Sequence, residues 1–117
     1  MALIQHEPGG EVVSQAIDEG ATISAVNLSE VIAKLADAGA TEALIRTALA
    51  RLNLDVVAFD AELAYSAGLL RPQTRQAGLS LGDRACLALA RRLAAEVITT
   101  DRAWADLDVE VAVRVAR

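Results

Sequence analysis

Cysteine, histidine and aromatic residues are scarce in this 117-residue chain, and each scarcity excludes a class of function. Cys86 is the only cysteine, so the chain forms neither an internal disulfide nor a cluster of thiolates. His6 is the only histidine and lies near the start of the sequence, which leaves Ser–His or Cys–His catalysis without a second supporting feature. Aromatic residues make up 3% of the chain, too few for a surface on which exposed bases stack.

Positive charge is also in short supply. The formal net charge is −5, which argues against a general basic binder of nucleic acids, because affinity for a polyanion depends on neutralising its phosphates. Lys34 is the only lysine, so the other basic residues are arginines, whose forked guanidinium suits phosphate contacts. The arginine content is explained equally well by a GC-rich genome. A nuclease with a local arginine patch around metal ions remains compatible with this acidic balance.

No long apolar run is present. A membrane helix needs roughly 20 consecutive apolar residues, and no stretch of the chain approaches that length. The first residues do not combine basic charge with a long apolar segment, as a signal peptide does. The apolar fraction of 54% is well above that of disordered chains. We therefore expect a folded cytoplasmic protein with one domain over residues 1–117.

Short strand-like runs alternate with amphipathic segments along the chain. Asp60 and Ser80 are suited to cap helices, and residues 71–78 form a polar loop around Pro72. The pattern predicts helices over residues 11–19, 28–39, 41–52, 60–70 and 80–95, a short turn or helix over 101–106, and strands over 22–24, 56–59, 96–99 and 109–115. This alternation favours an α/β layered fold with a parallel sheet.

Three carboxylates, Glu30, Asp83 and Asp101, stand where a strand-like run ends or a helix begins. In an open parallel sheet such junctions gather along one edge, where ligands bind. Clustered carboxylates repel one another unless a hard cation holds them, and Mg²⁺ or Mn²⁺ prefers oxygen ligands. A metal site that acts on phosphates is therefore the first hypothesis.

Each of these acids also has a purely structural interpretation. Glu30 fits the last position of a capping box that begins at Asn27. Asp83 fits the first turn of a helix, where acids are favoured, and Asp101 fits the cap of the turn that follows it. The joint placement of the three acids, rather than any one of them, supports the metal site.

Three segments of the chain resemble one family of nucleases. Residues 23–31 read ISAVNLSEV, residues 79–90 read LSLGDRACLALA, and residues 97–104 read VITTDRAW. In this order and at these intervals the segments resemble the PIN-domain ribonucleases, and they are closest to the VapC toxins of bacterial type II toxin–antitoxin pairs. The resemblance covers essentially the whole chain.

The resemblance implies a PIN-like fold of three layers, α/β/α, with a central parallel sheet flanked by helices. It implies that Glu30, Asp83 and Asp101 hold Mg²⁺ or Mn²⁺ and are the catalytic residues of an endoribonuclease. Thr99 matches a frequent hydroxyl position beside the last acid and is an accessory candidate. The implied partners are an RNA substrate, a cognate antitoxin protein and a second copy of the chain in a homodimer.

One element of the family pattern is absent. PIN domains begin with a short apolar strand that ends in an Asp, whereas residues 2–9 resemble the end of the helix that follows that strand. We therefore expect the first, central strand and its Asp to be missing, and we expect weak metal binding and poor RNA cleavage as a result. Either the native gene starts upstream of Met1, or an exchanged element or a partner chain completes the sheet.

A second class of function stays open, namely a catalytically inactive PIN domain that binds an antitoxin or forms oligomers. Two sets of apolar residues at helical spacing suit a partner helix as well as they suit a core. They are Val31, Ile32, Leu35, Leu44, Ala48 and Leu49. A receiver-like signalling domain with an acidic metal pocket ranks lower, because no lysine lies late in the chain, where such a site needs one.

Overall fold

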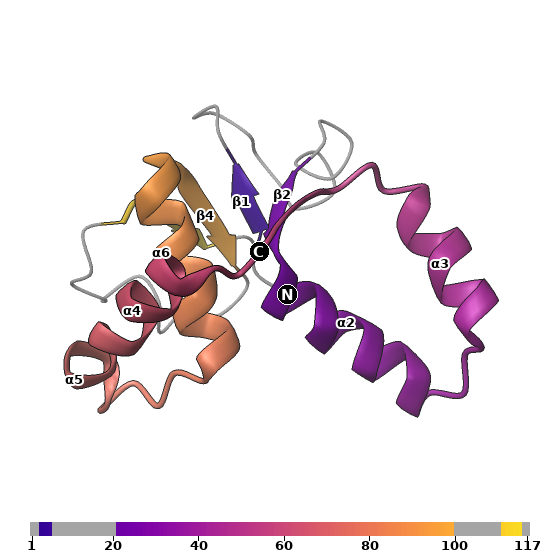
Figure 1. The fold of residues 1–117 in the computed structure, drawn as a ribbon, viewed down its shortest axis with the longest axis horizontal. Coiled ribbons are helices and arrows are strands. Elements are labelled where there is room, and N and C mark those ends of the chain that lie inside the picture. The colour runs from indigo at the N-terminus through magenta and orange to yellow at the C-terminus, as the bar shows by residue number, and fades with distance from the viewer. Residues whose placement is uncertain (1–2, 6–20, 100–110, 116–117) are drawn as a thin grey trace.

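The computed structural model describes residues 3–5, 21–99 and 111–115 (Figure 1). The described strands are β1 (Leu3–Gln5), β2 (Thr22–Ser24), β3 (Asp55–Val57), β4 (Glu96–Thr99) and β5 (Val113–Val115). The described helices are α2 (Ala25–Asp37), α3 (Glu42–Ala50), α4 (Ala61–Leu69), α5 (Arg71–Thr74) and α6 (Leu81–Leu93). The predicted helix over residues 11–19 and the predicted turn over 101–106 lie outside the described residues.

The described strands form one sheet in the order β3-β2-β1-β4-β5. β2 runs parallel to β3, with Ile23 opposite Val56, and β4 runs parallel to β5, with Ile98 opposite Arg114. β1 lies between these two pairs and is antiparallel to both of its neighbours. The predicted α/β fold with helices packed on a sheet is confirmed, and the sheet is parallel in its two outer pairs.

β1 occupies the centre of the sheet, where the sequence predicts a missing strand, but it runs antiparallel to its neighbours instead of parallel to them. Residues that the sequence pattern assigns to the end of a helix form a strand instead, with Ile4 opposite both Thr22 and Val97. The backbone groups along the inner edges of β2 and β4 need hydrogen-bond partners, and a short extended segment supplies them in either direction. Leu3–Gln5 contains no carboxylate, so this strand brings no acid to the sheet.

The start of α2 differs from the prediction and changes the position of Glu30. Ser24 caps the helix, and its Oγ accepts a hydrogen bond from the Val26 amide at 3.2 Å. The capping box predicted for Asn27 and Glu30 is therefore wrong, since both residues lie inside the helix. Ser24 takes the capping role because it ends β2, where the backbone is still extended as a cap requires.

The predicted caps at Asp60 and Ser80 are confirmed. At the start of α4, Asp60 Oδ1 accepts a hydrogen bond from the Leu63 amide at 2.9 Å. At the start of α6, Ser80 Oγ accepts from the Asp83 amide at 3.1 Å, and Asp83 Oδ2 accepts from the Ser80 amide at 3.0 Å. This reciprocal capping box fixes the first residue of α6 and the backbone position of Asp83.

Residues 71–78 begin with a short helix, α5, where a polar loop was expected. Pro72 fits the first turn of this helix because its missing N–H would have no intrahelical partner there. Thr74 is buried, and its hydroxyl donates a hydrogen bond to Leu70 O at 2.8 Å. Pro72 and the hydrogen bond of Thr74 both favour a helix here, although the polar composition predicts a loop.

α4 and α6 form most of the hydrophobic core together with β4. α6 buries the unbroken run of residues 85–90, and Leu63, Leu70 and Val97 belong to the same cluster. Cys86 lies within this run, in agreement with the prediction of a core cysteine. On the opposite side of Figure 1, α2 and α3 project away from the sheet, and Asn27 and Ile45 are their only buried residues.

Candidate functional site

α2 carries Glu30 to the N-terminal end of α6. Glu30 lies in the second turn of α2, and its carboxylate packs against the backbone of Gly82, the second residue of α6. A β-carbon at position 82 would overlap that carboxylate, so the glycine leaves the space that the acid occupies. Glu30 is exposed overall, and this contact does not remove it from solvent.

Asn27 joins Glu30 to α6. Its Nδ2 donates hydrogen bonds to Gly82 O at 2.9 Å and to Glu30 Oε1 at 3.3 Å. Asn27 is 8% exposed, and its Oδ1 has no hydrogen-bond partner within the described part of the chain. The sequence-based interpretation misses this contact, because there Asn27 only begins a capping box. The available signal was its position three residues before Glu30, which puts both side chains on one helix face.

Asp83 directly follows Gly82, in the first turn of α6. It is half-buried, and its capping box uses Oδ2, whereas Oδ1 takes no part in that box. The partial positive charge at a helix N-terminus favours carboxylates at this place. Two of the three predicted site residues are therefore found at the N-terminal end of α6, with Glu30 against Gly82 and Asp83 next in the sequence.

Cys86 responds to the charge of both acids. Its thiol lies in the core, one helical turn beyond Asp83. The pKa of this thiol is raised to about 12, mainly by burial and then by the negative charges of Asp83 and Glu30.

The third predicted acid, Asp101, lies outside the described residues. Thr99 is the last residue of β4, where it is opposite Val115, and Asp101 follows it by two positions in the sequence. β2 and β4 are both antiparallel to β1, so their carboxyl ends lie at the same edge of the sheet. Within residues 3–5, 21–99 and 111–115, no group of three or more His, Cys, Asp or Glu side chains could hold a metal ion.

The donor atoms that the structure brings together suit a hard cation. Glu30 and Asp83 offer carboxylate oxygens, which Mg²⁺ and Mn²⁺ prefer to sulfur ligands. Proteins usually bind Mg²⁺ through one or two carboxylates, and waters and substrate phosphates complete its coordination. The two acids are therefore of the ligand type that a metal ion in contact with a phosphate uses.

Comparison with known families identifies the class of protein. A family model described as PIN domain matches residues 1–110, so the chain belongs to the PIN domain family. This is a family of metal-dependent nucleases. No curated protein and no solved structure matches the chain. Of the helices that the structure describes, none has the length and apolar character needed to cross a membrane.

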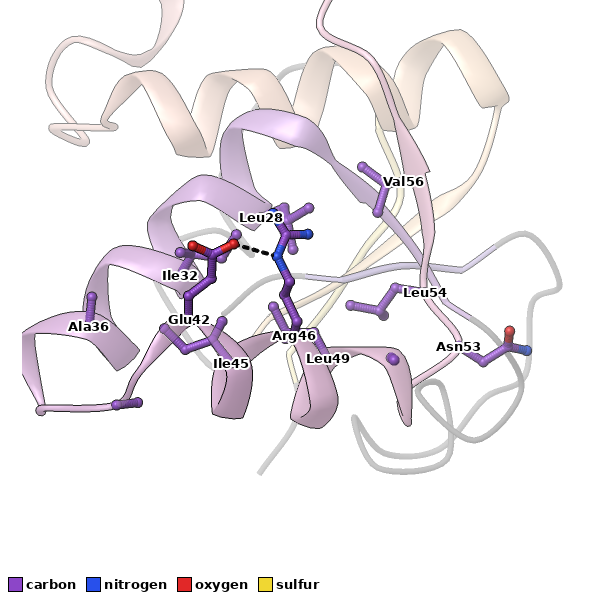
Figure 2. Close-up of a pocket in the computed structure, with 12 residues that line it drawn as sticks. Leu28, Ile32, Ala36, Glu42, Ile45, Arg46, Leu49, Asn53, Leu54 and Val56 are labelled. Atoms are coloured by element: carbon purple, nitrogen blue, oxygen red, sulfur yellow. Dashed lines mark hydrogen bonds and ion pairs between the residues drawn. The ribbon is translucent and has the colours of Figure 1, made fainter.

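A second feature is an apolar groove between α2, α3 and β3 (Figure 2). Its volume is about 720 Å³. The apolar side chains that line it include Leu28, Ile32, Ile45, Leu49, Leu54 and Val56.

An ion pair on α3 also lines the groove, together with some of the apolar residues that the sequence pattern identified. Arg46 Nε lies 2.8 Å from Glu42 Oε2, one turn apart on α3 (Figure 2). Ile32 and Leu49 line the groove, whereas Leu44 is not among its lining residues and is 63% exposed. The predicted apolar faces of α2 and α3 therefore only partly form one surface.

Proposed function

We propose that this chain is a Mg²⁺- or Mn²⁺-dependent endoribonuclease of the VapC toxin type that acts on RNA in the cytoplasm. Membership of the PIN family supports the nuclease class. The observation that carries the proposal is that α2 places Glu30 against Gly82, the residue before Asp83 in α6, although Glu30 and Asp83 are far apart in the sequence.

In this proposal Glu30, Asp83 and Asp101 hold the metal ion, and Thr99 is an accessory residue. A divalent cation bound there would lower the pKa of a bound water and stabilise charge on the scissile phosphodiester. The hydrogen bond from Asn27 orients Glu30, and the capping box orients Asp83. Two of the ligands are therefore oriented before a metal ion arrives, as an effective site requires.

We expect the site to bind its metal ion weakly. β1 occupies the centre of the sheet without supplying a carboxylate, so three acids rather than four are assigned to the site. Each carboxylate adds Coulomb attraction for a divalent cation, and the absence of one lowers that attraction. Turnover should therefore reach saturation only at high metal concentration.

Cleavage of single-stranded and structured RNAs by the purified protein tests this function. We expect cleavage with Mg²⁺ or Mn²⁺ and none with EDTA. Glu30→Gln and Asp83→Asn should each reduce the rate by at least about tenfold, the lower range for disturbed metal sites. Asp37→Asn is the matched control, because it makes the same chemical change at an exposed acid at the other end of α2. Cleavage that persists in EDTA or in Asp83→Asn refutes the proposal.

The apolar groove favours a second candidate, a non-catalytic PIN domain that binds an antitoxin helix or a second copy of the chain. Toxicity on expression, relieved by the product of the neighbouring gene, would support the nuclease toxin. Harmless expression together with a stable complex would support the binding module. In that case Ile32→Asp, inside the groove, should abolish the complex, whereas Glu30→Gln should leave it intact.

A further inference from the structure

Asn27 is the only buried residue of α2, and it is polar. A buried carboxamide lowers stability unless its donors and acceptors are satisfied. The groups that face its nitrogen, Gly82 O and Glu30 Oε1, are both acceptors, so only Nδ2 fits against them. Its Oδ1 is then left buried, with no hydrogen-bond partner among the described residues. An apolar side chain would pack α2 against α6 without this penalty, so packing alone does not explain an asparagine here.

Gly82 completes the contact from the side of α6. Any other residue at this position would place its β-carbon on the Glu30 carboxylate. Gly68, inside α4, offers a direct contrast, because a β-carbon there would meet no atom within 4 Å. Glycine inside a helix is destabilising relative to alanine. At position 82 the glycine provides the space that the Glu30 carboxylate occupies.

We infer that Asn27 and Gly82 are positioning residues that together fix the Glu30 carboxylate at the N-terminal end of α6 and thereby set the affinity of the site for a divalent cation. Asn27 holds one oxygen of Glu30, and Gly82 keeps its place open. The effect on metal affinity rests on the proposed function, whereas the positioning of Glu30 does not. Substituting either residue leaves every candidate ligand in the chain.

Thermal unfolding of the metal-free protein in EDTA tests the positioning. Gly68→Ala should raise Tm, because alanine is the better helix former and nothing obstructs its methyl group. Gly82→Ala should unfold several degrees below Gly68→Ala, because its methyl group displaces Glu30. In a Glu30→Ala background this difference should disappear, which is the coupling a double-mutant cycle detects. Equal effects of Gly82→Ala with and without Glu30 overturn the inference.

Binding of Mn²⁺ alone, followed by the electron paramagnetic resonance signal of the free ion, tests the effect on the site. Asn27→Ala and Gly82→Ala should each weaken Mn²⁺ binding by about tenfold. Ser29→Ala, at an exposed position of α2, should leave it unchanged. Adding Asn27→Ala to Glu30→Gln should cause no further loss, because Asn27 acts only through Glu30. An additive loss assigns Asn27 a purely structural role and overturns the inference.

The two measurements separate this inference from the proposed function. In one outcome, the Tm effects of substitutions at positions 30 and 82 are coupled, but the wild type binds no Mn²⁺. This outcome would overturn the metal-dependent function and the effect on affinity, while the positioning of Glu30 stands. Mn²⁺ binding by the wild type without thermal coupling would overturn the positioning and leave the nuclease proposal in place.

Discussion

Asp83 combines two tasks, and substitutions at this position separate them. Its Oδ2 accepts the Ser80 amide hydrogen bond at 3.0 Å and so completes the capping box of α6. Its negative charge belongs to the proposed metal site. Asp83→Asn keeps an oxygen acceptor for the box and removes the charge, whereas Asp83→Ala removes both.

The expected sizes of the two effects differ. A capping hydrogen bond contributes about 1 kcal/mol to the free energy of unfolding, and an acid in the first turn contributes about 0.5 kcal/mol through the helix dipole. In EDTA we therefore expect a loss of about 1.5 kcal/mol for Asp83→Ala and about 0.5 kcal/mol for Asp83→Asn. A metal ion at 100 times its dissociation constant adds about 2.7 kcal/mol to the wild type. Neither variant should gain this stabilisation at the same metal concentration.

Urea unfolding, first in EDTA and then with excess Mn²⁺, measures both effects. Ser80→Ala is the matched control, because it removes the other half of the capping box and keeps the carboxylate. It should lose about 1 kcal/mol in EDTA and retain the metal-dependent gain. A full metal-dependent gain in Asp83→Asn would refute the role of Asp83 as a ligand. Equal losses for Asp83→Asn and Asp83→Ala in EDTA would refute the separation of the two tasks.

Two further predictions concern titration and reactivity. The pKa of Asp60 is lowered from 3.8 to about 2, first by its hydrogen bonds to Arg92 and then by the Leu63 amide, so its stabilisation is present above about pH 4 and lost as the pH falls toward 2. The difference in Tm between wild type and Asp60→Asn should therefore be constant near neutral pH and shrink as the pH falls toward 2, and a difference that keeps its neutral-pH size there contradicts this cause. Cys86, buried with a pKa of about 12, should resist alkylation in mildly alkaline buffer until the protein is denatured, and mass spectrometry showing rapid labelling of the native protein would contradict its placement.

Helix starts were predictable where one polar residue separates an extended run from an apolar helix. Asp60 and Ser80 are such residues, and both cap helices as expected. The predicted strands at residues 22–24 and 96–99 have the observed boundaries of β2 and β4. In these segments the secondary structure that the local sequence favours is the one found in the fold.

The errors arose where a distant part of the chain decides the local structure. β1 pairs with β2 on one side and with β4 on the other, and these pairings satisfy backbone groups of all three strands. The sequence of residues 3–5 alone does not predict these pairings. The start of α2 was placed at Asn27 because Asn and Glu three residues apart imitate a capping box, while Ser24 stands nearer the strand end. Asn27 was thereby given a local role, although its amide serves a contact with another helix.

The same limit applies to the candidate site. The acids themselves could be found, because Glu30 and Asp83 stand at junctions between strand-like and helical segments. The residues that surround them could not, because the room left by Gly82 exists only when α2 lies against α6. Asp101 remains a prediction.

The hydrogen bonds of the acids distinguish structural carboxylates from candidate ligands. Asp60 is paired with a cation, since Arg92 donates two hydrogen bonds to it at 2.8 and 3.1 Å. Within the described part of the chain, the donors that hold Glu30 and Asp83 are neutral, namely the Asn27 amide and the Ser80 backbone. Arg84 follows Asp83 directly, yet its Nη1 donates to Ala67 O at 3.0 Å. Neutral donors orient a carboxylate without placing a positive charge beside it. Among the described residues, neither Glu30 nor Asp83 has an ion pair of the kind that Asp60 has, and this is the condition that the proposed metal site requires.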